Sequence, residues 1–332
     1  MNARNILVTG GAGYIGSHTC MALAAAGYVP VVLDNLSTGN REDVRWGPFE
    51  EGDVRDVDRV AGILEQHDIW AVMHFAASAY VGESVENPEL YYGNNVVGIV
   101  HLLRACRQSG VNKVVFSSSC ATYGIPEALP IHEGTPQIPI NPYGRTKLLG
   151  EQVLQDYATA YDFNYAILRY FNACGADPSG VLSEKHLPET HLIPLALMAA
   201  SGQIAQLDVY GTDYPTPDGT CIRDYIHVAD LADGHVLALR NLEQGGGNLK
   251  VNLGSGIGHS IFEVIAAIKE VTGHDVPISL KSRRAGDPPV LLANPDLAKK
   301  VLNFETRYSD IQTIVRHAAP TFGLDIENDQ AC

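Results

Sequence analysis

The sequence predicts an α/β fold in which a doubly wound parallel sheet is followed by a smaller mixed α/β region. Short apolar runs alternate with helical periods through the first half of the chain, which is typical of βαβ units. A glycine-rich turn at residues 10–16 separates the first apolar run from the first helical period. After Asn172 the regular alternation ends, which indicates a change of architecture. With 332 residues, 45% of them hydrophobic, the chain can bury a large core.

Strands and helices are expected to alternate through the first half. We place strands on short apolar runs, at residues 5–9, 30–34, 71–75, 113–118 and 165–169. We place helices where apolar residues recur every three to four positions, at residues 15–26, 57–67, 94–109 and 142–161. Gly27 and Gly110 follow two of these helices, where glycine commonly ends a helix, and Pro142 begins the last one. The connections should be right-handed.

The second half contains fewer regular segments. Residues 173–191 carry Gly, Pro, Ser and charged residues without a clear period, and we interpret them as a loop over a site. We expect helices at 192–201, 225–240 and 261–272, strands at 207–210 and 250–253, and a turn-rich loop at 213–218. The strand at 250–253 should return to the main sheet. The two regions are therefore expected to interleave, as residues 1–172 with about 224–254, and residues 173–223 with 255–332.

The chain is acidic, with 23 Lys and Arg residues against 38 Asp and Glu residues and a net charge of −15. This charge repels nucleic acids and anionic membrane surfaces, so neither is an expected partner. It also repels anionic small molecules. A phosphate-bearing ligand must therefore bind at a local cluster of arginines or at helix N-termini.

No signal peptide or membrane span is expected. Residues 5–8 are apolar but run directly into glycines, and no apolar stretch is long enough to cross a bilayer. The cysteines form no CxxC motif and no paired spacing, which favours reduced thiols in the cytoplasm; they lie at positions 20, 106, 120, 174, 221 and 332. The histidines are scattered and none has a metal-ligand spacing, so no metal site is predicted.

The glycine-rich turn predicts a Rossmann-like dinucleotide site. Gly10 permits the tight turn, Gly13 lets the backbone approach a pyrophosphate, and Gly16 lets the helix pack closely on the sheet. Tyr14 and Ile15 begin the helix, whose N-terminal N–H groups and dipole attract phosphates. No Gly-Lys-Ser/Thr follows, which excludes a P-loop.

Acidic and small residues at later strand ends extend this site. Asp34 ends the second strand, where its carboxylate can accept from the adenine ribose hydroxyls. Asn35 follows without a neighbouring Arg or Lys, which favours NAD over NADP because a 2′-phosphate would face an unneutralised carboxylate. Asp53, before Val54, could contact the adenine or serve only as a turn aspartate. The segment Phe75, Ala76 and Ala77 is equally compatible with close approach to a cofactor and with tight packing.

Tyr143 and Lys147 lie four residues apart, on one face of a predicted helix. A lysine ammonium and a positively charged nicotinamide both favour the phenolate, so Tyr143 could act as a base near neutral pH. The pair alone is equally compatible with a surface or packing pair. Residues 117–119 are three serines at the end of the preceding strand, where a hydroxyl would meet the same substrate oxygen. A glycine turn, strand-end serines and a tyrosine–lysine pair together form a far more specific motif than the pair alone.

With these motifs the chain resembles the extended short-chain dehydrogenase/reductases, and within them the bacterial UDP-glucose 4-epimerases. The resemblance extends over nearly the whole chain. The matching runs are residues 8–18, 33–36, 81–84, 94–96, 168–172, 218–220, 223–228 and 284–287.

The resemblance implies a role for each matching residue. Ser119 would be the catalytic hydroxyl, Tyr143 the base, and Lys147 the residue that binds the nicotinamide ribose. The cofactor site would also include Val54, Asn94, Ser117, Tyr170 and Phe171. The substrate site would include Asn172, His191, Leu192, Tyr210, Arg223, Arg284, Asp287 and Leu291, with both arginines on the diphosphate and the aspartate on a ribose hydroxyl. Forked, permanently charged donors suit a diphosphate.

The resemblance also implies an activity and an assembly. The activity is interconversion of UDP-glucose and UDP-galactose by reversible oxidation at sugar C4 with bound NAD. The assembly is a homodimer formed through helices of the cofactor region. Residues 1–172 would form the NAD-binding domain, joined by about 224–254, and the remaining segments would form the nucleotide-sugar-binding domain.

Departures from the family pattern leave the identity of the sugar undecided. Ala79 occupies a position where many members carry lysine, and Leu291 one where some carry a bulky tyrosine that bounds the sugar pocket. UDP-pentoses and UDP-N-acetylhexosamines are therefore alternative substrates. A 4,6-dehydratase needs an acid pair after the serine, but Cys120 and Ala121 cannot protonate a leaving hydroxyl. A non-catalytic NAD-binding protein typically lacks the tyrosine or the lysine, and this chain has both.

Overall fold

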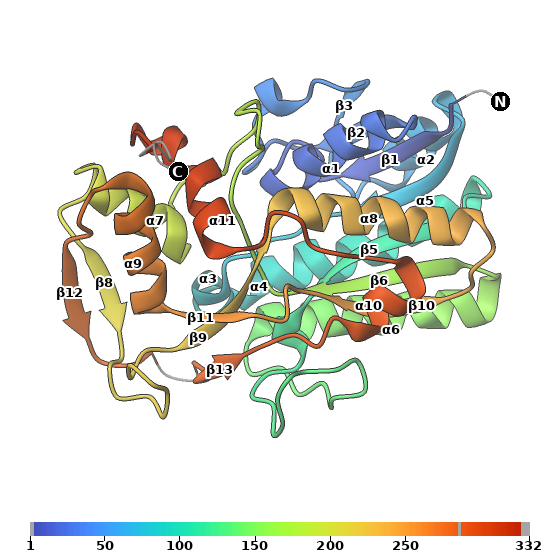
Figure 1. The fold of residues 1–332 in the computed structure, drawn as a ribbon. Coiled ribbons are helices and arrows are strands. Elements are labelled where there is room, and N and C mark those ends of the chain that lie inside the picture. Colours follow the sequence, from blue (N-terminus) through green and yellow to red (C-terminus); the bar gives the residue numbers. More distant parts are fainter. Residues whose placement is uncertain (1–2, 285–286, 327–332) are drawn as a thin grey trace.

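The structure is a computed structural model that describes residues 3–284 and 287–326. Its main sheet consists of β1 (Asn5–Thr9), β2 (Val29–Asp34), β3 (Phe49–Glu51), β4 (Ile69–His74), β5 (Lys113–Ser119), β6 (Asn164–Tyr170) and β10 (Leu249–Leu253). These strands lie in the order β10-β6-β5-β4-β1-β2-β3, and every pair is parallel (Figure 1). The strand order reverses between β1 and β4, which is where open α/β sheets bind ligands. The predicted doubly wound fold is confirmed.

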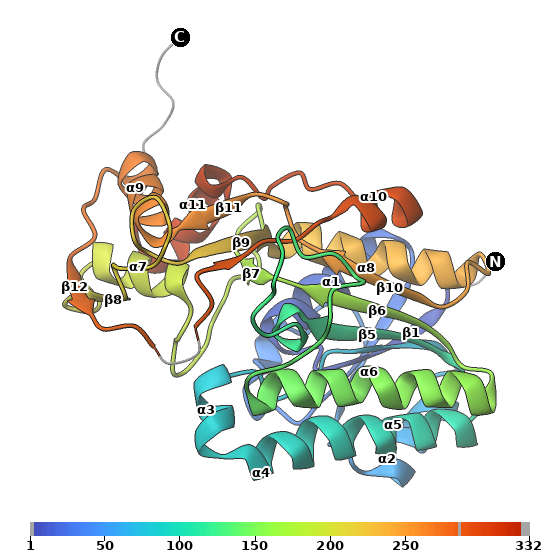
Figure 2. The same cartoon turned by 90° about the horizontal axis from the view of Figure 1, so that it is seen from below.

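Helices cover both faces of this sheet (Figure 2). One layer contains α1 (Tyr14–Ala25) and α8 (Val228–Glu243), and the other contains α2 (Val57–Gln66), α5 (Val97–Gln108) and α6 (Pro142–Tyr161). Successive residues of a strand point to opposite faces, so β1 contributes to two cores. Ile6 and Val8 pack with residues of α1 and α8, whereas Leu7 packs with residues of α2, α5 and α6. All three side chains are fully buried.

The rest of the chain forms a smaller α/β region. Its larger sheet contains β7 (Asn172–Cys174), β9 (Ile222–His227), β11 (Gly258–Ser260) and β13 (Val290–Leu291), and its smaller sheet pairs β8 (Leu207–Tyr210) with β12 (Ile278–Lys281). The helices α7 (Leu192–Ala200), α9 (Ile261–Thr272) and α11 (Ile311–Ala318) contribute to one core with β8 and β9. A capping box begins α9: Ser260 accepts from the Glu263 N–H, and the Glu263 carboxylate accepts from the Ser260 N–H.

Shorter elements connect these layers. They are α3 (Val81–Glu86), α4 (Pro88–Tyr91), a π-helical segment (Tyr92–Val96), α10 (Asp296–Leu302) and 3₁₀ segments at Arg41–Asp43, Cys120–Thr122 and Ala319–Phe322. The π-helical segment runs directly into α5. Among the described residues, no helix is both long and apolar enough to cross a membrane.

Several sequence expectations need correction. The helix predicted at 225–240 was wrong at its start, because residues 222–227 form β9 and α8 begins only at Val228. Tyr225 and Ile226 are apolar in strand and helix patterns alike, and pairing with β7 decides for the strand. The helix predicted at 94–109 begins later, because its first residues are π-helical. The short strands β7, β11, β12 and β13 and the helices α3, α4, α10 and α11 were not predicted. Ala285, Gly286 and Cys332 lie outside the described residues.

Candidate active site

The glycine turn places the start of α1 against the end of β1. Gly10 has a φ of +72°, and a Cβ there would lie 2.6 Å from the Ala76 nitrogen. A Cβ on Gly16 would lie 2.1 Å from the Gly10 carbonyl oxygen, so neither position tolerates a side chain. Gly13 precedes α1 and no side chain caps the helix, so its first N–H groups are free to bind an anion.

The first two residues of α1 face different surroundings. The Tyr14 hydroxyl donates to the Gly175 carbonyl oxygen at 2.6 Å, which joins the glycine turn to the segment after β7. Ile15 packs against the core beneath the turn. The glycine turn therefore contacts both regions of the protein.

The Asp34 carboxylate lies on the glycine turn at the end of β2. Its Oδ2 accepts from the Ala12 N–H at 3.0 Å, and its Oδ1 accepts from the Leu36 N–H at 2.9 Å. Burial raises the pKa of this carboxyl, and the two N–H donors oppose that effect. The carboxylate is thus fixed beside the free N–H groups of α1, as a dinucleotide site requires.

Asn35 and Asp53 meet at the neighbouring strand end. The Asn35 amide donates to Asp53 Oδ2 at 3.4 Å. Arg55 forms an ion pair with Asp53 at 2.6 Å, and this contact holds the pKa of Asp53 down, at about 2. Val54 is buried in the core with residues of α2 and α5.

The segment after β4 runs beside the glycine turn. The N–H groups of Phe75 and Ala76 both donate to the Thr9 carbonyl oxygen, at 2.9 and 3.0 Å. Ala77 continues this segment and is only partly buried. Small residues allow this approach, in agreement with the tight packing considered from the sequence.

Two asparagines of the π-helical segment hold Ser78. Asn94 Nδ2 donates to Ser78 Oγ at 3.1 Å. Asn95 Oδ1 accepts from the Ser78 N–H at 2.8 Å, and its Nδ2 donates to Thr146 Oγ1 at 3.0 Å. Asn95 thereby connects the segment after β4 to α6, a role that the sequence reasoning missed.

Ser119, Tyr143 and Lys147 lie where β5 ends and α6 begins. Asn141 caps α6 by accepting the Gly144 N–H at 2.8 Å, which fixes the first turn of the helix. Tyr143 and Lys147 are 7% and 4% exposed, so both reactive groups are buried. Lys147 Nζ donates to the Ser117 carbonyl oxygen at 2.8 Å and lies 5.9 Å from the centre of the Tyr143 ring.

The electrostatics of these residues differ in part from expectation. Burial lowers the pKa of Lys147 to about 8, against the opposing charge of Glu151. Burial raises the pKa of Tyr143, and the Ser119 hydroxyl opposes the rise. In the protein without cofactor the pKa of Tyr143 is therefore raised, because desolvation of the phenolate outweighs the Ser119 donor, whereas the lowered pKa was expected with a positively charged nicotinamide beside it.

A small apolar cluster bounds the other side of this site. The Ser117 and Tyr170 hydroxyls form a hydrogen bond of 2.8 Å, below the end of β5. Phe171 and Cys120 belong to a separate core cluster, and Leu291 packs against it. Leu291 therefore lies against the cluster that contains Cys120, the residue after Ser119.

The predicted phosphate-binding arginines lie in the smaller region. Arg223 pairs with Leu291 across β9 and β13, and its guanidinium forms an ion pair with the Asp287 carboxylate. Burial raises the pKa of Cys120 to about 12, and the charge of Arg223 opposes the rise, so Arg223 acts close to the end of β5. The Arg284 guanidinium lies 4.0 Å above the Tyr210 ring.

Comparison with known families identifies the chain. The NAD dependent epimerase/dehydratase family matches residues 6–254. The chain belongs to this family. The NAD dependence of this family agrees with the cofactor predicted from Asp34. The family match confirms the resemblance drawn from the sequence.

Individual relatives of this epimerase-family chain are similar over nearly their full length. A UDP-glucose 4-epimerase from Rhizobium leguminosarum bv. trifolii is 52% identical over 318 residues, which cover 96% of this chain and 97% of that protein. The structure of a UDP-glucose 4-epimerase from Brucella ovis in complex with NAD is 61% identical, with a TM-score of 0.96 and coverage of 98% and 100%. A UDP-glucose 4-epimerase from Stenotrophomonas maltophila with bound NAD and formylated UDP-arabinopyranose is 41% identical, with a TM-score of 0.93 and coverage of 96% and 98%.

The sequence reasoning missed a buried network behind the site of this epimerase-family chain. Glu151 lies on α6, one helical turn after Lys147, and accepts from Arg169 and from the Ser118 hydroxyl. Arg169 also donates to the Tyr123 hydroxyl at 2.9 Å. The spacing of Tyr143, Lys147 and Glu151 at every fourth residue was a signal for a shared helix face.

Three residues that were predicted to contact the nucleotide lie on β7 and at the start of α7. Asn172 begins β7, and Leu192 begins α7 directly after His191. The His191 side chain is 46% exposed, and its Nδ1 contacts Glu184 and Glu189 at 3.0 and 2.8 Å.

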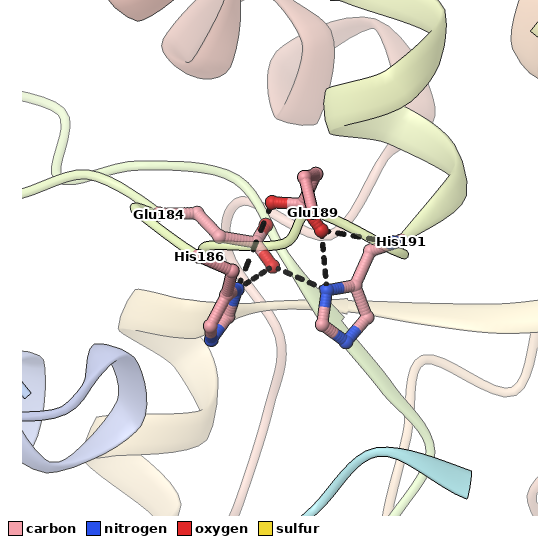
Figure 3. A group of neighbouring side chains, drawn as sticks. All are labelled: Glu184, His186, Glu189 and His191. Atoms are coloured by element: carbon pink, nitrogen blue, oxygen red, sulfur yellow. Dashed lines mark hydrogen bonds and ion pairs between the residues drawn. The ribbon is translucent and has the colours of Figure 1, made fainter. Parts of the chain in front are cut away.

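His186 joins the same two carboxylates (Figure 3). Burial lowers the pKa of each of these histidines, but the two carboxylates outweigh it, so the pKa rises to about 9 for His186 and about 10 for His191. This cluster was not predicted.

Proposed function

We propose that the protein interconverts UDP-glucose and UDP-galactose, by reversible oxidation at C4 of the sugar with bound NAD. The observation that carries the proposal is the buried set of Ser119, Tyr143 and Lys147, where β5 ends and α6 begins, in a sheet whose glycine turn leaves helix N–H groups free. UDP-glucose 4-epimerases that are 52% and 61% identical over nearly the whole chain support the same reaction.

Tyr143 is the proton acceptor in this proposal. It takes the proton of the sugar 4-hydroxyl and returns it when the new configuration forms, while Ser119 holds the same oxygen. NAD held by the glycine turn and Lys147 would supply the hydride acceptor and donor for C4 of the sugar. Lys147 binds the nicotinamide ribose, and its ammonium charge favours the phenolate form of Tyr143.

Other residues hold the cofactor. Gly10, Gly13, Tyr14, Ile15 and Gly16 receive the pyrophosphate at the start of α1, and Asp34 and Asn35 receive the adenine ribose. Asp53 lies beside the adenine. The chain segments that complete the cofactor site are Phe75, Ala76, Ala77, Asn94, Ser117, Tyr170 and Phe171, with Val54 packed behind them.

The substrate is held by its diphosphate and not by its sugar. Arg223 and Arg284 supply the permanent charge that a chain of net charge −15 needs at this point. Asp287, which is paired with Arg223, accepts a hydrogen bond from a ribose hydroxyl. The nucleotide is surrounded by Tyr210, Asn172, His191 and Leu192. A weak grip on the sugar is required, because the 4-keto sugar must turn between the two hydride transfers.

The chain is divided accordingly in this proposal. Residues 1–172 with about 224–254 bind NAD, and residues 173–223 with 255–332 bind the nucleotide sugar. The position of β10 at the edge of the main sheet, beside β6, supports the return of the chain to the NAD-binding part.

We also propose a cytoplasmic homodimer. Apolar side chains are exposed along neighbouring helices of the cofactor region, at Val85 of α3, Leu90 of α4, Val97 of α5 and Leu149 of α6. Five buried free cysteines agree with a reducing compartment. Sedimentation of the purified protein at twice the chain mass of 35.8 kDa is the expected result.

A second group of sugars deserves a direct comparison. Leu291 leaves the sugar side of the site open, and a 41% identical epimerase binds a formylated UDP-arabinopyranose, a pentose derivative. UDP-pentoses and UDP-N-acetylhexosamines are therefore alternative substrates for the same chemistry.

The test is incubation of the purified protein with UDP-galactose, followed by chromatography of the nucleotide sugars. We expect UDP-glucose to form without net change in NADH absorbance. Formation of no UDP-glucose, with UDP-xylose and UDP-N-acetylglucosamine also unchanged, would overturn the proposed function.

A further inference from the structure

Four side chains of the loop between β7 and α7 converge on one point, as Figure 3 shows. They are Glu184, His186, Glu189 and His191, and their candidate ligand atoms all lie within 4.8 Å of one another. The unit Glu-x-His occurs twice, at 184–186 and at 189–191. We propose that these four residues bind a divalent transition-metal ion of the Zn²⁺ class.

The distances between the converging atoms fit a tetrahedral ion. His191 Nδ1 lies 2.8 Å from Glu189 Oε1 and 3.0 Å from Glu184 Oε1. His186 Nδ1 lies 3.1 Å from Glu184 Oε1 and 3.7 Å from Glu189 Oε2. Zinc bonds to nitrogen and oxygen are each roughly 2.0–2.2 Å long, so tetrahedral ligand atoms lie about 3.3 Å apart. Three of the four separations are shorter than this value and one is longer, and Glu189 presents a different oxygen to each histidine, so small side-chain shifts would complete a tetrahedral shell.

Hydrogen bonds alone do not account well for this arrangement of side chains. The Nδ1 atom of His191 faces two carboxylate oxygens, but one N–H group points in one direction and donates a single well-aligned bond. Both histidines also share the same oxygen of Glu184. A cation at the centre interacts favourably with all four groups at once.

The charge of the cluster is compatible with a bound divalent cation. The Glu184 and Glu189 side chains are only 4% and 9% exposed, so two carboxylates have been largely removed from water and need positive partners. A divalent ion can replace the two histidine protons, since with two neutral imidazoles it neutralises both carboxylates.

The donor set selects among metals. Two imidazoles with two carboxylates suit zinc and its neighbours in the transition series, whereas Ca²⁺ and Mg²⁺ prefer sites built from oxygen alone. Four protein ligands fill a tetrahedral shell and leave no position open for a substrate. The ion is therefore structural.

The ion would fasten the loop over the start of α1. The His186 ring packs edge-on against Tyr14, the first residue of α1, with 5.9 Å between ring centres. Lys185 ties the same loop to Asp43 at 3.1 Å, and His191 directly precedes α7. Metal uptake requires neither NAD nor a sugar nucleotide, so it can be tested separately from the proposed epimerase reaction, although His191 belongs to both sites.

The first test is titration of chelator-treated, full-length protein with Zn²⁺ in a calorimeter. We expect one ion per chain, and a rise in melting temperature when Zn²⁺ is added. His186→Gln should weaken Zn²⁺ binding by at least about 100-fold, since loss of outer-shell partners alone costs up to about that factor. His259→Gln is the matched control, because it removes a histidine that lies 3.9 Å from Glu263 elsewhere on the surface. It should leave Zn²⁺ binding unchanged.

Cobalt supplies a second readout. Co²⁺ in the chelator-treated protein should give the intense visible absorption of a tetrahedral site, and the His186→Gln variant should lose it. Glu189→Gln tests the site again if His186→Gln does not fold, as judged by circular dichroism. The proposal is overturned if wild-type protein retains no zinc after loading and desalting, or if a folded variant of the cluster binds Zn²⁺ as tightly as His259→Gln.

Discussion

Arg169 and Glu151 form a two-pronged ion pair in the interior of the protein, one helical turn beyond Lys147. The guanidinium donates from Nε at 2.9 Å and from Nη2 at 2.6 Å, and the two side chains are 3% and 0% exposed. The Ser118 hydroxyl donates to the same carboxylate. The pair therefore fixes the end of β5, which carries Ser119, relative to the helix that carries Tyr143.

Removal of this carboxylate should destabilise the protein strongly. Glu151→Ala leaves Arg169 buried without a counter-charge, which costs on the order of 3–5 kcal/mol of unfolding free energy. Urea unfolding of the cofactor-free protein measures the loss. The control is Asp275→Asn, which breaks an exposed pair with Lys269 at 2.7 Å and should cost less than about 1 kcal/mol. Equal losses of unfolding free energy in the two variants would show that the buried pair contributes no more to stability than the exposed pair.

Removal of the Tyr143 hydroxyl should abolish most of the chemistry and leave the fold intact. Tyr143→Phe keeps the buried ring but removes the proposed proton acceptor, so turnover of UDP-galactose should fall about 100- to 10,000-fold. Bound NAD, measured after release by heat, should stay near one per chain. Tyr161→Phe, at an exposed position near the end of the same helix, is the control. Near-normal turnover of Tyr143→Phe would refute the assignment of the base.

Lys147 should make the stability of the cofactor-free protein depend on alkaline pH. Burial lowers its pKa from 10.5 to about 8, so between these values the unfolded chain binds the proton and the folded chain does not. Unfolding free energy should therefore rise with pH across this window, by on the order of 3 kcal/mol from this group. Lys147→Met should lack this rise. The measurement is urea unfolding of both proteins at pH 7.5 and pH 10, and parallel pH profiles would contradict the prediction.

Arg284 should contribute to nucleotide binding and not to cofactor binding. Arg284→Gln removes a charge from the proposed diphosphate site, so the affinity for UDP should fall about 10- to 100-fold, as expected for a charged hydrogen bond of about 1.5–3 kcal/mol. NAD content should not change. Arg283→Gln is a matched control on the same segment, since Arg283 pairs with Asp213. Calorimetric titration with UDP distinguishes the two, and equal affinities would exclude Arg284 from the site.

Leu291 should set the breadth of accepted sugars. Its side chain packs beside Phe171 and Cys120, at the end of β5. Leu291→Tyr adds volume at this wall, so turnover of UDP-N-acetylglucosamine relative to UDP-glucose should fall while turnover of UDP-glucose is retained. A substrate panel on the two proteins measures the ratio. An unchanged ratio would place the wall of the sugar pocket elsewhere.

Local patterns predicted the main sheet and its cofactor edge well. Contacts within a few residues or across one strand require glycine at Gly10 and Gly16. Asp34 ends a strand with a clear apolar run. Such features depend on short-range geometry, so they are visible in the sequence. The strand–helix alternation predicted the layers for the same reason.

Features that depend on distant contacts were not predictable. The segment at 222–227 is apolar at positions that fit either a helix or a strand, and only its partners β7, β11 and β13 decide. The cluster around His191 joins four residues whose loop has no regular period, so metal-ligand spacing rules derived from helices and hairpins did not detect it. The raised pKa of Tyr143 arises from burial, which a sequence motif does not reveal.

The chain passes between its two regions without a linker. A single residue, Phe171, separates β6 of the main sheet from β7 of the smaller one, and β9 runs directly into α8 at Val228. A protease or a truncation therefore meets no natural boundary at which the halves separate: a fragment that ends at residue 254 keeps β9 but loses its neighbours β11 and β13. We therefore expect the two regions to fold as one unit.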